Sequence, residues 1–78
     1  VKLFIEINTR HLVDEINDLH KKVQKLLNLE KQIKEVPKMP PEKAVEIVQE
    51  ARKRILEISK AAHKMETRCI AIISDLLI

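Results

Sequence analysis

The segment VPKMPP (residues 36–41) decides the fold of this chain, because it separates two long stretches with helical hydrophobic patterns. Its three prolines interrupt a helix, since each lacks a backbone N–H and the residue before a proline avoids the helical region. Pro41 suits the first turn of a following helix, where the missing N–H costs nothing. The sequence therefore predicts helices over about residues 2–35 and 41–76, joined by a stiff hinge at 36–41.

Both predicted helices carry one stripe of mainly apolar residues, spaced alternately by three and four positions. In the first helix the stripe contains Ile5, Leu12, Ile16, Leu19, Val23, Leu26 and Ile33, with Thr9 and Glu30 in register. In the second helix it contains Ala44, Val48, Ala51, Ile55, Ile58, Ala62, Met65, Cys69, Ile72 and Leu76. This spacing is typical of a helix that packs along one seam against a neighbour.

Folding the second helix back along the first brings together stripe residues whose numbers sum to 77 or 78. Large side chains then face small ones, as in the predicted pair of Ile16 and Ala62. We predict an all-α, antiparallel, coiled-coil-like hairpin forming a single domain over residues 1–78. Glu30 in the stripe is expected to point its carboxylate outward, although a polar seam residue can also select one register.

The first eight residues permit a second interpretation. Val1, Leu3, Ile5 and Ile7 alternate with polar residues, which is the pattern of a strand, but Phe4 breaks it. A strand here would need to pair with the same strand of another chain. We expect helix, because a helix beginning near residue 2 would cover Ile72 and Leu76.

Apolar residues beside the stripes predict a further interface, because two helices cannot bury them all. These residues are Val13, Leu27, Leu29, Val45, Ile47, Leu56, Ile70, Ile73 and Leu77. A two-fold dimer of hairpins would cover them in a four-helix bundle, and a different helical partner would serve equally well.

Composition excludes several classes of protein. With 78 residues and no Gly, the chain is too short for two domains and cannot form glycine-rich phosphate loops. A single Cys permits no intrachain disulfide. No apolar run reaches membrane-spanning length, and the start lacks the order of a signal peptide. We expect a soluble protein, cytoplasmic or recombinant.

Candidate chemical groups are few. His11 and Glu15 are spaced i, i+4, and His63 and Glu66 are spaced i, i+3, so the four could share a metal ion. Solvated helix faces explain them better, and we expect no cofactor. Cys69 lies in the stripe, where a small apolar filler is expected. No catalytic motif is present, and we expect no enzyme activity.

The basic run Arg52-Lys53-Arg54 raises the alternative of an RNA-binding helical-hairpin dimer. The surface is mixed, with 15 basic and 12 acidic residues, and no Tyr or Trp is available to stack on bases. We therefore expect solvated helix surface and no nucleic-acid partner. A metal-binding bundle is the other alternative.

Residues 40–60 combine a Pro-Glu helix start, Ala, Val and Ile inside, and Glu, Lys and Arg outside. In this style the chain resembles the idealised helices of de novo designed bundles, mainly over residues 21–60, which implies a regular helical packing and an engineered origin. The turn Pro37-Lys38-Met39-Pro40 is also similar in spacing to that of type III secretion needle subunits, whose turns are more polar.

Residues 1–20 and 63–78 depart from that style and meet at the open end of the predicted hairpin, away from the hinge. We therefore expect a non-enzymatic protein–protein interaction or oligomerisation module that binds itself or another helical protein through this end. The candidate contact residues combine apolar anchors with one arginine: Phe4, Ile7, Arg68, Ile73 and Leu77. A natural dimerisation hairpin from a larger protein would have the same features.

Overall fold

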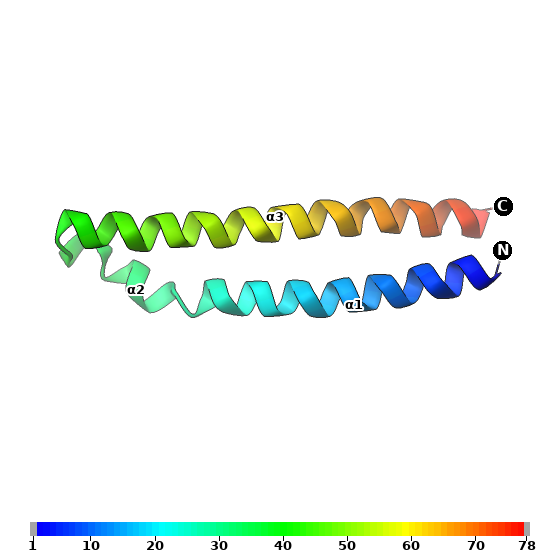
Figure 1. The fold of residues 1–78 in the computed structure, drawn as a ribbon, viewed down its shortest axis with the longest axis horizontal. Coiled ribbons are helices and arrows are strands. Elements are labelled where there is room, and N and C mark those ends of the chain that lie inside the picture. The colour runs from blue at the N-terminus through cyan, green and yellow to red at the C-terminus, as the bar shows by residue number, and fades with distance from the viewer. Residues whose placement is uncertain (1, 78) are drawn as a thin grey trace.

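In the computed structural model, which describes residues 2–77, the chain is a long antiparallel hairpin of two helices (Figure 1). Helix α1 spans Lys2–Leu27 and helix α3 spans Pro41–Leu77. The short helix α2 (Glu30–Lys34) and the 3-10 turn η1 (Val36–Lys38) connect them. The hairpin measures 57 × 15 × 13 Å, and no strand occurs within residues 2–77. The predicted all-helical hairpin is thus confirmed, including helix over residues 2–8; Val1 lies outside the described residues.

The hinge forms where the prolines predict it. Val36–Lys38 make one 3-10 turn, and Met39 is extended at φ −87° and ψ 155°, which reverses the chain. Pro41 is the first residue of α3, and the N–H of Ala44 donates to the carbonyl of Pro40 at 3.0 Å. Because nothing interrupts the sequence after Pro41, α3 continues to Leu77, one residue beyond the predicted end.

The first helix is interrupted, contrary to the prediction of an unbroken helix to residue 35. The break lies at Asn28 and Leu29, where the N–H of Leu29 bonds to Leu26 at 3.0 Å in a tight i−3 pattern. After the break, Ile33 is 38% exposed, although it would continue the half-buried row of Leu19 and Leu26 in an unbroken helix. Glu30 is exposed and lies 3.6 Å from Lys34. The break therefore takes Ile33 out of the predicted seam, and the Glu30 carboxylate is exposed, as expected.

Four heptad rows describe the hairpin. The central row lies between α1 and α3 and is half-buried or buried, as predicted. Its members are Ile5, Leu12, Leu19 and Leu26 in α1 and Ala44, Ala51, Ile58, Met65 and Ile72 in α3. Ala51 alone is buried among the residues whose burial the structure describes, at 7% exposure. The isolated hairpin therefore has a seam but hardly any interior.

The predicted seam contains a second row beside the central one, and the prediction that this second row is buried is wrong at most positions. The helices are rotated so that a polar row joins the contact instead: Asn8, Glu15 and Lys22 in α1, and Ile47, Arg54, Ala61, Arg68 and Asp75 in α3. The predicted row, here called the apolar row, is exposed except for Val23. It comprises Thr9, Ile16 and Val23 in α1 and Val48, Ile55, Ala62, Cys69 and Leu76 in α3. The predicted pairs of Ile16 with Ala62 and Thr9 with Cys69 therefore do not form a buried seam.

The apolar rows of both helices lie on the same side of the hairpin. Two antiparallel helices are related by a local two-fold axis perpendicular to their common plane, so equivalent heptad positions fall on the same side of that plane. The polar rows occupy the opposite side for the same reason. Together, the two apolar rows define one side of the hairpin, here called the apolar face. A fourth row in α3, the outer row, borders it: Val45, Arg52, Ser59, Glu66 and Ile73.

Candidate functional site: the apolar face

A salt-bridged clasp on the polar side explains why the helices are rotated. Arg68 on α3 donates from Nε to Glu15 Oε1 and from Nη2 to Glu15 Oε2 at 3.5 Å, and its Nη1 donates to Asn8 Oδ1 at 3.2 Å. The side chain of Glu15 is only 14% exposed, and Lys64 approaches it at 3.8 Å. Such two-pronged contacts between guanidinium and carboxylate are stronger than neutral hydrogen bonds. They draw the helices together on this side and leave the apolar side open.

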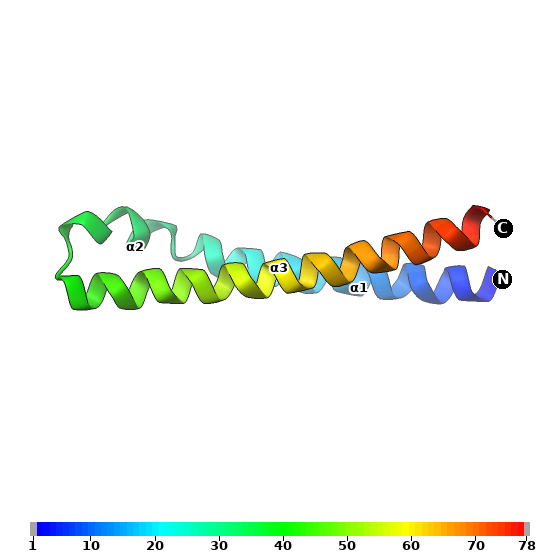
Figure 2. The same cartoon turned by 90° about the horizontal axis from the view of Figure 1, so that it is seen from above.

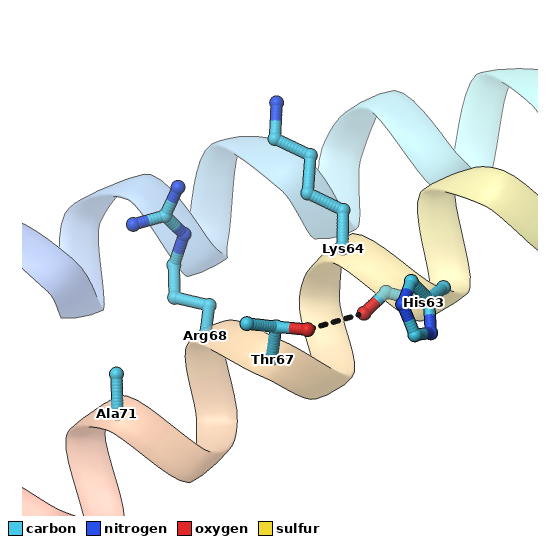
Figure 3. Close-up of a pocket in the computed structure, with 5 residues that line it drawn as sticks. All are labelled: His63, Lys64, Thr67, Arg68 and Ala71. Carbon is cyan, nitrogen blue, oxygen red and sulfur yellow. Dashed lines mark hydrogen bonds between the residues drawn. The ribbon is translucent and has the colours of Figure 1, made fainter.

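The pocket beside this clasp offers no second function. It measures about 400 Å³ and is lined by His63, Lys64, Thr67, Arg68 and Ala71 of α3. In Figure 3, Lys64 and Arg68 extend toward α1, while the Thr67 hydroxyl donates back to the carbonyl of His63 at 3.2 Å. Its cations are thus directed at Glu15, so the hollow is a by-product of the clasp.

The rest of the polar side is organised by ion pairs within single helices. Arg54 lies 2.7 Å from Glu50 and 3.7 Å from Glu57, and Lys22 lies 2.7 Å from Asp18. The hydrogen bond from Lys22, with its positive charge, lowers the pKa of Asp18 below its ordinary value. These pairs keep the polar side hydrated and charge-balanced. The predicted basic run is accordingly not one surface, because Arg54 is paired here whereas Arg52 belongs to the outer row.

The apolar face, in contrast, contains side chains that the hairpin does not cover. Ile55 remains 54% exposed, Val48 50% and Leu76 64%, and Ile16 on α1 is 48% exposed. In α3 these residues recur at intervals of seven, from Val48 to Leu76. The face therefore runs along nearly the whole length of α3 instead of being confined to the open end.

The predicted contact residues are not brought together as one cluster. The two views in Figures 1 and 2 agree that the ends of α1 and α3 lie side by side, so all five are near the open end. Ile73 borders the apolar face in the outer row, and Leu77 is exposed beside it. Phe4 and Ile7 are exposed but share heptad positions with polar residues on other sides of α1. Arg68 is not a free rim cation, because Glu15 and Asn8 already bind it.

The metal candidates are not assembled into one site. Glu15 is bound by Arg68, while His63 and Glu66 occupy heptad positions of α3 that face away from it. Within the described part of the chain, no three His, Cys, Asp or Glu side chains are grouped to hold a metal ion. Cys69 is exposed on the apolar face, not buried in the seam as expected, because the rotation of α3 turns its row outward.

The hydrophobic pattern of the sequence does not reveal the clasp, although the charges of its residues are a signal for it. Glu15 and Arg68 occupy equivalent heptad rows of the two helices and carry opposite charges, but hydrophobic patterning does not place these rows in the seam.

No family model, curated protein or solved structure matches this chain. No helix within residues 2–77 has the length and hydrophobicity to cross a membrane.

Proposed function

We propose that this chain is a non-enzymatic helical interaction module that assembles through its apolar face. A second hairpin placed on this face would complete a four-helix bundle, and a second copy of the chain is the simplest occupant. The observation that carries the proposal is the line of exposed apolar residues along α3, with Ile16 of α1 on the same side. In a bundle, this line would become the interior that a lone hairpin lacks.

The exposed area supports a large interface. The hairpin exposes 6473 Å², whereas a compact monomer of 9.1 kDa exposes about 4,900 Å² by the usual scaling with mass. The excess is about 1,600 Å² per chain, or roughly 3,200 Å² for a pair. Obligate homodimers bury about 2,000–5,000 Å² in total, so one further copy can account for this excess.

The polar side gives no comparable support to another occupant. Its charges are largely paired within the hairpin, and its long side chains keep it hydrated. Ile73, in the outer row, extends the proposed surface toward the termini, whereas Leu77 continues the row of Leu56 outside it. We therefore retain the open end as part of the interface while placing its centre along α3.

The test is the mass in solution, measured by light scattering over a concentration series. We expect the wild-type chain to have twice the 9.1 kDa monomer mass. Ile55→Lys should weaken the dimer by at least about 100-fold, because each interface would then bury two unpaired ammonium groups. Leu56→Lys is the matched control: Leu56 is 55% exposed, nearly as Ile55, but its heptad row faces away from α1 and lies outside the apolar face.

The proposal fails if the wild-type chain is monomeric throughout the series. It also fails if Ile55→Lys and Leu56→Lys weaken the dimer equally, since that would place the contact elsewhere. Far-UV circular dichroism of both variants is the control that checks whether each remains helical.

A further inference from the structure

We infer that the two hairpins pack with their hinges at opposite ends, so that α3 lies antiparallel on α3 of the second copy with the two-fold axis near Ser59. This rests on the proposed function, because it concerns the same face. Only two two-fold arrangements place both apolar faces together. In the other arrangement the hinges lie at the same end, and α3 packs on α1 of the second copy.

The outer row of α3 favours the first arrangement, because residues at equal distances on either side of Ser59 are complementary to one another. From Val45 to Ile73 the row reads apolar, cationic, small polar, anionic and apolar. Antiparallel packing about Ser59 sets Arg52 beside Glu66 of the second copy, and the two-fold axis repeats this pair. The same operation sets Val45 beside Ile73. Every position of the row then meets a complementary one.

The alternative arrangement juxtaposes unlike groups. Contacts of Lys64 with Glu15 and of Arg68 with Asn8 define which residues of α1 and α3 lie at equal height in the hairpin. At those heights, the α1 residues facing the outer row would be Glu6, Val13 and Leu27. Arg52 would then lie beside Leu27, and Glu66 beside Val13. Both charges would be desolvated without a partner, which is costly.

The apolar rows are compatible with the same axis. A two-fold axis at Ser59 places Val48 level with Cys69 of the second copy, and Ile55 level with Ala62 of the second copy. Larger side chains thus face smaller ones, which lets two helices approach closely and interdigitate. Arg52 and Glu66 are also available for the contact, since neither forms an ion pair with another described residue of the hairpin.

Cysteine cross-linking tests the arrangement in the full-length chain. The background is Cys69→Ser, which removes the only native thiol. Ser59→Cys should form an intermolecular disulfide under mild oxidation, because the two positions meet at the axis and a disulfide needs Cα atoms within about 7 Å. Lys60→Cys is the matched control: it neighbours Ser59 but points away from the apolar face. A mixture of Ser59→Cys and His20→Cys chains reports the alternative, in which those two residues lie at the same height across the interface.

The outcomes separate the two proposals. Rapid cross-linking of Ser59→Cys with neither Lys60→Cys nor the mixed product supports the opposite-hinge dimer. A dimer that yields mainly the mixed product overturns this arrangement but leaves the proposed function intact. Equal cross-linking of Ser59→Cys and Lys60→Cys also overturns it, since the disulfide would then reflect random collision. A monomer by light scattering overturns both proposals.

Charge reversal provides an independent measurement. Arg52→Glu should weaken the dimer by about ten-fold, because it creates two like-charge contacts with Glu66 across the interface. Adding Glu66→Arg should restore the affinity to within about three-fold of wild type. If the double variant is as weak as the two single variants combined, the residues do not meet and the inferred arrangement is wrong.

Discussion

The clasp between Glu15 and Arg68 should contribute measurable coupling energy to the hairpin. We consider the variants Glu15→Ala and Arg68→Ala and the double variant, compared as a thermodynamic cycle. The pair makes two charge-assisted contacts, and both side chains are at most one-quarter exposed. Exposed ion pairs contribute about 0.2–1 kcal/mol, while a hydrogen bond to a charged group contributes about 1.5–3 kcal/mol. A partly buried clasp should fall between them, at about 1.5 kcal/mol.

The assay is urea denaturation followed by far-UV circular dichroism, at one fixed protein concentration because association would shift the midpoint. The Glu50–Arg54 pair is the matched control, with a 2.7 Å contact inside a single helix turn. It should couple by about 0.2–0.5 kcal/mol. A coupling for Glu15 and Arg68 no larger than this control would refute the view that the clasp holds the two helices together.

Two further predictions concern single side chains. Ala51→Leu should lower the free energy of unfolding by about 1–3 kcal/mol, because Ala51 is buried where the helices approach. Ala62→Leu, on the exposed apolar face, should lower it by less than half as much. Urea denaturation under monomeric conditions measures both values. Asp18→Asn should lower stability at neutral pH, since Lys22 lowers the pKa of Asp18 in the folded state. The stabilisation by the Asp18 carboxylate is fully present above the unfolded-state pKa and is lost as the pH falls through the folded-state pKa. The thermal midpoints of wild type and Asp18→Asn should therefore converge in acid; a difference that persists at low pH would contradict the assignment.

The elements of this fold could be predicted from sequence because local signals suffice for them. Three prolines define the hinge, and an uninterrupted heptad pattern defines α3. The break at Asn28 could not be predicted, since asparagine is only mildly unfavourable in a helix and no proline or glycine marks the position. The central row was also predictable, because it is apolar in every heptad of both helices.

The choice between the two flanking rows could not be made from hydrophobicity. Hydrophobic patterning favours the row of Ile16 and Ile55, and that row is the one left exposed. The structure instead places Glu15 and Arg68 in the contact, where long side chains bridge two helices that lack further neighbours. Patterning reports which residues prefer burial, but not whether the neighbour that buries them belongs to the same chain. For the candidate site, the sequence predicts contact residues at the open end, whereas only the rotation of the helices in the structure shows that exposed apolar residues continue along α3.

The clasp and the apolar face are physically coupled. A lone hairpin without the Glu15–Arg68 contact could turn both helices inward and bury Ile16 against Ala62 and Ile55 against Val23, gaining roughly 2 kcal/mol for each large side chain covered. The clasp opposes this rotation because its three donors reach Glu15 and Asn8 only on the polar side. It therefore keeps the apolar face directed outward, where a second helical hairpin can cover it. Stability inside the hairpin and availability of the surface outside it thus depend on the same few atoms.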